Sequence, residues 1–314
     1  MEEGRGAEGG VGEGAGGIAD FFAVSNCTTI KTIDSPVTHN TLVKTQGAWM
    51  KDPLGVMGND TIFVLEHYHS NKVEEFENME KFKAGVKSNT YTLPYYWDGT
   101  GAVVYGSYVY YNRILLMALI SCVVSLKHRA NTNYIDKYNL LTNSLVAQIT
   151  LNGYTPRQTY YQWGGRSGVD LAVDEKGLWV LWGNSGDNKR LYASKIDDDA
   201  IVQSYSVSTD SFMAKHLNIW VGPCLFVSLF EAEQMRYIGN AFVVCGVIYL
   251  IDSYHQNPTT INYAYDTKTG TQWNPNIQFT NQYGYNSMVD YNPRERLLYA
   301  WDSRRQVTYS LTWN

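Results

Sequence analysis

The sequence predicts an all-β fold assembled from repeated antiparallel units, as in a β-propeller. Tyr and Trp, which favour half-buried positions on a pleated sheet, are abundant, with 25 and 9 copies in 314 residues. In addition, four segments alternate apolar and polar residues on either side of a turn, which is typical of hairpins. These segments are 102–111, 171–181, 242–252 and 288–302. Repeated hairpins of this kind favour propeller blades.

The N-terminal residues differ in composition from the rest of the chain. The first 18 residues contain eight Gly and four Glu, which cannot bury a core, so we expect a flexible leader over 1–19 and a folded domain over 20–314. The opening Met-Glu-Glu-Gly lacks the basic and apolar regions of a signal peptide. A secreted domain with this start either lacks its natural N-terminus or carries an artificial one.

The four hairpins are expected to turn, in chain order, at Gly106, near Gly177, at Gly246 and at Asn292-Pro293. The first two glycine intervals are 177 − 106 = 71 and 246 − 177 = 69 residues. A propeller blade needs only about 40–50 residues, so each interval contains an excess.

Two apolar stretches account for that excess, because neither alternates like its surroundings. One is 114–129, which begins ILLMALISCVVSL, and the other is about 216–236, which contains LNIWVGPCLFVSLF. Each is too short to span a bilayer, which takes about 20 apolar residues. We therefore expect two apolar inserts in the propeller, and we predict that the chain is less stable than a version lacking them. Exposed, such segments would promote aggregation.

Charge and cysteine usage exclude several classes of protein. The formal net charge of −5 gives no basic footprint for nucleic acid. The four cysteines include no CxxC pair of the kind that binds zinc. An isolated disulfide in a large domain remains open at this point.

Several motifs resemble the olfactomedin family, in the order in which the family carries them. The resemblance covers about Cys27 to the C-terminus. The motifs are WGG at 163–165, VDLAVDEKGLWV at 169–180, GNAFVVCG at 239–246, NYAYDT at 262–267, and MVDYNPRER with LYAWD over 288–302.

This resemblance implies a five-bladed β-propeller that is extracellular and acts by binding other proteins. Within the family the chain is most similar to gliomedin-type members, which bind axonal adhesion molecules of the neurofascin and NrCAM type at nodes of Ranvier. Regions outside this chain would supply any oligomerisation. We expect neither a nucleic-acid partner nor a membrane span.

The resemblance also implies a disulfide between Cys27 and Cys245, with two buried free thiols as the alternative. Cys122 and Cys224 lie in the expected inserts and could pair with each other, stay free or mispair. Two N-glycosylation sequons begin at Asn26 and Asn59.

A structural calcium ion in the central channel is a further implication of the resemblance. Its ligands would be the side chains of Asp170, Asn240 and Asp290 and the backbone carbonyls of Ala241 and Val289, and sodium could lie nearby. Calcium takes six to eight oxygen ligands, so five from the protein leave room for water. From the residues alone, Asp170 in its apolar strand could instead cap a turn or pair with Lys or Arg, because a buried lone carboxylate is costly.

The alternative function is a calcium-dependent propeller hydrolase of the lactonase or glycosidase type. Such an enzyme needs a metal open to substrate and an acid/base pair beside a pocket. The motif positions leave no carboxylate or histidine over for that pair. We therefore expect a binding module and not an enzyme.

Overall fold

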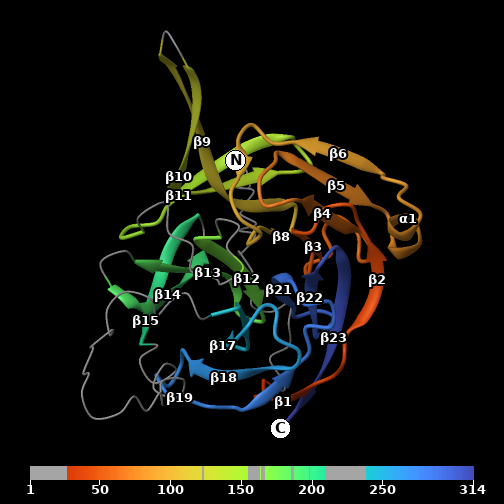
Figure 1. Ribbon diagram of the computed structural model, residues 1–314, viewed down its shortest axis with the longest axis vertical. Helices are drawn as coiled ribbons and strands as arrows, with labels where there is room; N and C mark the ends of the chain where they lie inside the picture. The colour runs from red at the N-terminus through yellow and green to blue at the C-terminus, as the bar shows by residue number, and fades with distance from the viewer. Residues whose placement is uncertain are drawn as a thin grey trace, which may run out of the picture.

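The computed structural model describes residues 27–121, 124–154, 163, 167–184, 187–197, 199–208 and 238–314. These residues form five antiparallel sheets arranged around a central axis, with a single short helix (Figure 1). The predicted five-bladed, all-β propeller is confirmed. The expected leader over 1–19 and the second expected insert at about 216–236 lie outside the described residues.

The first three sheets follow one another along the chain. Blade one comprises β3 (Gly47–Lys51), β4 (Ile62–Glu66), β5 (Lys72–Phe76) and β6 (Asn89–Thr92), with α1 (Met79–Lys83) between its outer strands. Blade two comprises β7 (Tyr96–Trp97), β8 (Val103–Tyr105), β9 (Tyr108–Ser121), β10 (Val124–Asn139) and β11 (Ser144–Thr150). Blade three comprises β12 (Val169–Asp174), β13 (Gly177–Asn184), β14 (Asp187–Asp197) and β15 (Ala200–Ser208).

The last two sheets include both ends of the described chain. Blade four comprises β16 (Asn240–Val244), β17 (Val247–Ile251), β18 (Thr259–Asp266), β19 (Gln272–Trp273) and β20 (Ile277–Phe279). Blade five comprises β21 (Asn286–Asn292), β22 (Leu297–Asp302) and β23 (Arg305–Trp313), and it is completed by β1 (Ile30–Ile33) and β2 (Val37–Thr41). The N-terminal strands therefore close the ring by pairing with the C-terminal strand.

The predicted hairpins join the inner two strands of blades two to five. In blade four the turn residues Cys245 and Gly246 both have positive φ, of 54° and 79°, as a type I′ turn requires. Gly106 and Gly177 also have positive φ at the turns of blades two and three. The turn predicted at Asn292-Pro293 begins there and ends at Arg296, whose φ is 56°.

The first expected insert is a continuation of the sheet. Strands β9 and β10 stay paired from Ile114 opposite Asn131 to Ser121 opposite Val124, and they form a ribbon that projects from the body (Figure 1). The pairing register shifts at the root of this ribbon, between Asn131 and Ile135. There the Asn112 side chain donates to the carbonyls of Thr132 and Tyr134, which stabilises the irregular backbone.

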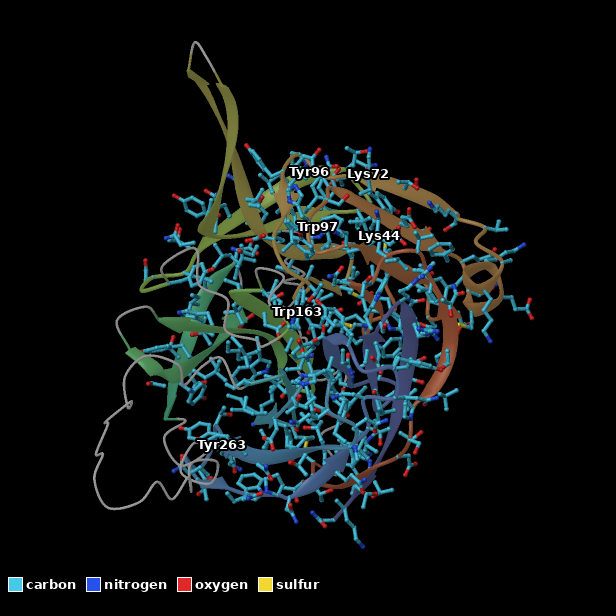
Figure 2. The ribbon with its side chains drawn as sticks, viewed as in Figure 1. Lys44, Lys72, Tyr96, Trp97, Trp163 and Tyr263 are labelled. Atoms are coloured by element: carbon cyan, nitrogen blue, oxygen red, sulfur yellow. A yellow bond between two sulfur atoms is a disulfide. The ribbon has the colours of Figure 1, made fainter. Side chains whose placement is uncertain are left out.

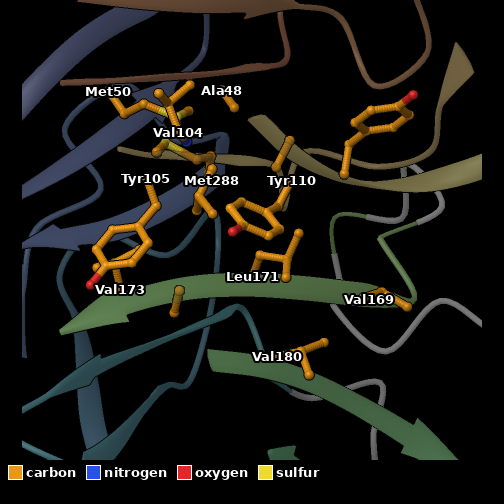
Figure 3. Packing of buried hydrophobic residues seen from close by; sticks show 14 of the residues in the cluster. Ala48, Met50, Val104, Tyr105, Tyr110, Val169, Leu171, Val173, Val180 and Met288 are labelled. Carbon is orange, nitrogen blue, oxygen red and sulfur yellow. Dashed lines mark hydrogen bonds between the residues drawn. The ribbon is translucent and has the colours of Figure 1, made fainter. Parts of the chain in front are cut away.

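The core lies between the sheets and around the axis. The innermost strands β3, β8, β12, β16 and β21 are buried along nearly their whole length, so they read as apolar runs in the sequence. Side chains fill the space between neighbouring sheets, with Trp163 toward the middle and Lys72 at the outer edge (Figure 2). Around β12, Leu171 and Val173 pack with Met50, Val104 and Met288 from three other blades (Figure 3).

Two contacts fasten the N-terminal segment to blade four. Cys27 and Cys245 form the predicted disulfide. The backbone N–H of Ile30 donates to the Tyr249 hydroxyl at 3.2 Å. The single helix of the described residues, α1, is too short to cross a membrane.

Candidate metal centre

The five predicted calcium ligands lie on three innermost strands that contact one another. Asp170 is in β12, Asn240 and Ala241 open β16, and Val289 and Asp290 are in β21. Each of the three strands contacts the other two. An innermost strand has only one neighbour within its own sheet, so alternate carbonyls on its free edge can face the axis. The topology thus brings the predicted residues to one region of the axis.

Asp290 is the most unusual of these residues. Its side chain is buried, and among the described residues neither Oδ1 nor Oδ2 has a hydrogen-bond partner. Burial raises the pKa of the Asp290 carboxyl well above its ordinary value, and the negative charge of Asp170 raises it further. A buried carboxylate without donors is costly, and a second carboxylate beside it adds repulsion. A bound cation would remove both costs.

Asp170 is buried at 8 % exposure, and blade two packs directly against it. The N–H of Leu171 donates to the carbonyl of Gly101 at 2.9 Å, across the gap between the two blades. A Cβ added to Gly101 would lie 2.6 Å from the Asp170 Cα and would also meet its carboxylate. Only glycine permits this approach, so Gly101 is a positioning residue that the sequence motifs did not indicate.

Asn240 uses its amide nitrogen within the protein. Its Nδ2 donates to the Asn286 carbonyl at 3.0 Å, which links the starts of β16 and β21 and fixes the amide plane. That bond does not involve the amide oxygen, the atom that a hard cation takes. The residues present therefore fit a hard, oxygen-preferring cation, with two carboxylates and an amide oxygen from three blades and backbone carbonyls nearby.

A small cavity is lined in part by Asp290. Its volume of about 20 Å³ has room for about one water molecule. The lining is mainly apolar, with Met50, Val103, Val104 and Val173, and it also includes Tyr299 and Lys51. The cavity can hydrate an ion at Asp290, but it is too small for an organic substrate.

A second acidic pair, Asp174 at the end of β12 and Glu175 directly after it, faces the turn of blade four. Asp174 accepts hydrogen bonds from the Trp179 indole at 2.7 Å, from Lys176 N and from Gly246 N. Burial, only partly offset by these bonds, raises the pKa of Asp174 to about 6. Glu175 accepts from Cys245 N at 2.8 Å and from the Tyr291 hydroxyl at 2.7 Å. Both lie in a motif quoted for the family, yet nothing in the sequence indicated that they join three blades.

The remaining predicted residues lie apart from this centre. Asn59 is exposed in the loop between β3 and β4, as a glycosylation acceptor must be. Asn26, Cys122 and Cys224 lie outside the described residues.

Comparison with known proteins places this geometry in context. The sequence model of the olfactomedin-like domain family matches residues 22–314 of this chain. Myocilin from Bos taurus is 29% identical over 304 residues, which is 95% of this chain and 53% of that protein. Myocilin from Oryctolagus cuniculus is 30% identical with the same coverage, so the chain spans about half the length of these relatives. A solved glutaminyl cyclase from Myxococcus xanthus is 12% identical, with a TM-score of 0.44 over 89% of this chain and 96% of its own.

Proposed function

Because this chain belongs to the olfactomedin family, we propose that it is an extracellular protein-interaction module whose propeller is stabilised by a structural calcium ion. The partners would be cell-surface adhesion proteins of the neurofascin and NrCAM type, as gliomedin-type members bind. Regions outside this chain would supply oligomerisation. Asn26 and Asn59 would carry N-linked glycans in that compartment.

The observation that carries the calcium proposal is the buried Asp290 carboxylate without a described hydrogen-bond donor. Asp170, Asn240 and Asp290 would bind the ion through side-chain oxygens, and Ala241 and Val289 through carbonyls. When bound, the ion would neutralise the two carboxylates and join three blades at the axis. Sodium near Asp170 fits the same oxygen donors, although its lower charge would neutralise less of the repulsion.

The burial of this site supports a structural ion over a catalytic one. Each of the five proposed ligands is at most 8 % exposed, and the adjoining cavity has room for about one water molecule. A propeller lactonase or glycosidase needs its metal open to an organic substrate. We therefore propose that the chain is a binding module and not an enzyme, and that partners contact its outer loops and faces.

The calcium proposal is tested by the Asp170→Ala variant. Calcium at about 100 times its Kd would add about 2.7 kcal/mol to the wild-type free energy of unfolding, or roughly 5–10 °C in melting temperature. Asp170→Ala should lose this calcium-dependent increase, measured by thermal unfolding with EDTA or with calcium. Asp197→Ala is the matched control, because Asp197 is exposed at the end of β14. A normal calcium response in Asp170→Ala would overturn the assignment.

The partner proposal is tested separately by surface plasmon resonance with neurofascin and NrCAM ectodomains. Saturable binding by the full chain, weakened when EDTA destabilises the propeller, is the expected result. An unrelated adhesion ectodomain of similar charge serves as the control. Calcium stabilisation without ectodomain binding would reject the partner class while leaving the metal site intact.

A further inference from the structure

A second cluster of metal-ligating side chains lies at the periphery, where blades three and four meet the N-terminal segment. Its members are Cys27, Glu175 and Cys245, and their ligand atoms all lie within 4.8 Å of one another. Cys27 precedes β1, Glu175 is in the turn between β12 and β13, and Cys245 is in the turn between β16 and β17. Three segments distant in sequence therefore place two sulfur atoms and a carboxylate at one point.

The Glu175 carboxylate is held in place by the protein. One oxygen accepts from the backbone N–H of Cys245, and the other accepts from the Tyr291 hydroxyl. Each carboxylate oxygen has two lone pairs, so both retain one for a metal. Hydrogen bonds of this kind orient metal ligands in known sites.

A positive charge lies against the same turn. A Cβ on Gly246 would collide with the Lys176 ammonium, so this ammonium lies against the residue that follows Cys245. Its charge would partly offset the negative charge that two thiolates and the Glu175 carboxylate would bring together.

We propose that, when the Cys27–Cys245 disulfide is reduced, Cys27, Cys245 and Glu175 bind a thiophilic divalent cation of the zinc class, with water as the fourth ligand. A dithiol reductant transfers two electrons and two protons to the disulfide and is itself oxidised to a disulfide. Zinc then displaces the two thiol protons and binds both thiolates. Zn–S bonds of about 2.3 Å and Zn–O bonds of about 2.0–2.2 Å need ligand atoms that lie close together. The three ligand atoms here lie within 4.8 Å of one another.

This site differs in chemistry and position from the centre at the axis. Two thiolates and one carboxylate form a soft donor set, whereas the axial residues offer only oxygen, which suits calcium. Cys27 is exposed, and Glu175 and Cys245 are half-buried, so a reductant and a metal can reach them. The metal would keep the segment before β1 attached to blade four when the covalent link is broken.

The test uses the full chain with Cys122→Ser and Cys224→Ser, so that Cys27 and Cys245 are the only thiols. The protein is reduced with a phosphine under excess calcium, which occupies oxygen-only sites, and it is titrated with Co²⁺ and then with Zn²⁺. We expect thiolate-to-cobalt charge-transfer absorption in the reduced protein and not in the oxidised protein, and loss of that absorption when zinc displaces cobalt. Absence of this absorption in folded, reduced protein would overturn the proposal.

Variants separate the three ligands. Cys245→Ser should abolish the charge-transfer absorption; if it does not fold, as judged by circular dichroism, the exposed Cys27→Ser takes its place. Glu175→Gln should bind Zn²⁺ roughly tenfold or more weakly, because the carboxylate ligand is lost. Glu74→Gln, an acidic residue paired with Lys87 in blade one, is the matched control. Wild-type zinc affinity in Glu175→Gln would reject the three-ligand site.

Discussion

At the Asp290 carboxylate, burial and the charge of Asp170 act in the same direction. Both raise the pKa of this group above its ordinary value of 3.8, so ionised Asp290 destabilises the metal-free fold. We predict that Asp290→Asn raises the melting temperature in EDTA at neutral pH and abolishes its increase with calcium. Differential scanning calorimetry with and without calcium measures both effects. Lower stability than wild type in EDTA would show that the carboxylate is satisfied without a metal.

The same group sets the sign of a pH dependence. Above pH 3.8 the unfolded chain has lost the Asp290 proton while the metal-free folded state retains it, so the free energy of unfolding falls as pH rises toward the folded pKa. Calcium bound at the proposed site would replace that proton, so acidification of the calcium-bound protein should instead release the ion and lower the melting temperature. Opposite slopes with EDTA and with calcium are the expected result, and Asp290→Asn should flatten both.

A substitution at Gly101 tests the geometry of the proposed site and leaves every candidate ligand in place. Gly101→Ala would bring a Cβ against Asp170, and overpacking of this kind costs about 1–3 kcal/mol. We expect a lower melting temperature and weaker calcium binding, measured by isothermal titration calorimetry. Gly85→Ala is the control, because Gly85 has positive φ but nothing within 4 Å of an added Cβ. It should lose about 1 kcal/mol through its backbone and keep its calcium affinity.

The sequence motifs indicated the candidate metal ligands, but they did not indicate the residues that position those ligands or join the blades around them. Asp170 and Asp290 stand out because each is a carboxylate within an apolar strand. Gly101, Asp174 and Glu175 act across blade boundaries, and such contacts depend on how sheets pack around the axis. No periodicity along one strand contains that information.

At the scale of elements, hairpins with tight turns were predictable and the blade-two ribbon was only half predictable. Gly106 and Gly246 each interrupt a stretch of alternating apolar and polar residues, and both have the positive φ that a tight hairpin turn requires. The segment after Ile114 does not alternate, so the sequence indicated an insert but not that β9 and β10 would stay paired through it. Blade one was missed because a ten-residue loop, 52–61, joins β3 to β4 in place of a tight turn.

The ribbon supplies a prediction about stability. A two-stranded ribbon beyond its sheet is marginally stable alone, and its unpaired edges promote association. Replacing residues 115–130 with Asn-Gly keeps Ile114 opposite Asn131 and should leave the melting temperature unchanged or higher while reducing aggregation. Thermal unfolding and light scattering measure these outcomes. Replacing only 122–123 with Asn-Gly controls for the new turn, and a clear loss of stability on trimming would contradict the expectation.

At the scale of the whole molecule, the ring depends on strands from both ends of the chain. Deleting 27–34 would remove Cys27 and β1, and with them the disulfide and the Ile30 contact to Tyr249. The disulfide alone closes a long loop, for which chain entropy gives about 5 kcal/mol. We expect the deletion to abolish cooperative unfolding, measured by circular dichroism. Deleting 1–19 is the control and should change nothing, because the folded domain is expected to begin at 20.

The number of blades could not be predicted from the hairpin patterns alone. One reason is that the ring is closed by strands from both ends of the chain. Blade five draws β21, β22 and β23 from one end of the chain and β1 and β2 from the other, so its full pattern is never contiguous. The family resemblance provided the number, and the sheet pairing confirms it.

Ring closure by β1 and β2 also has a consequence for biosynthesis. Within this domain, a ribosome delivers these strands well before their partner β23, with more than 260 residues between Thr41 and Arg305. Throughout translation the growing polypeptide would carry two strands whose hydrogen-bonding edge has nothing to pair with. Any message that terminates before β23 would release a product unable to close, whatever the quality of its other four blades. Quality control by chaperones would therefore act on this domain mainly after β23 has been synthesised.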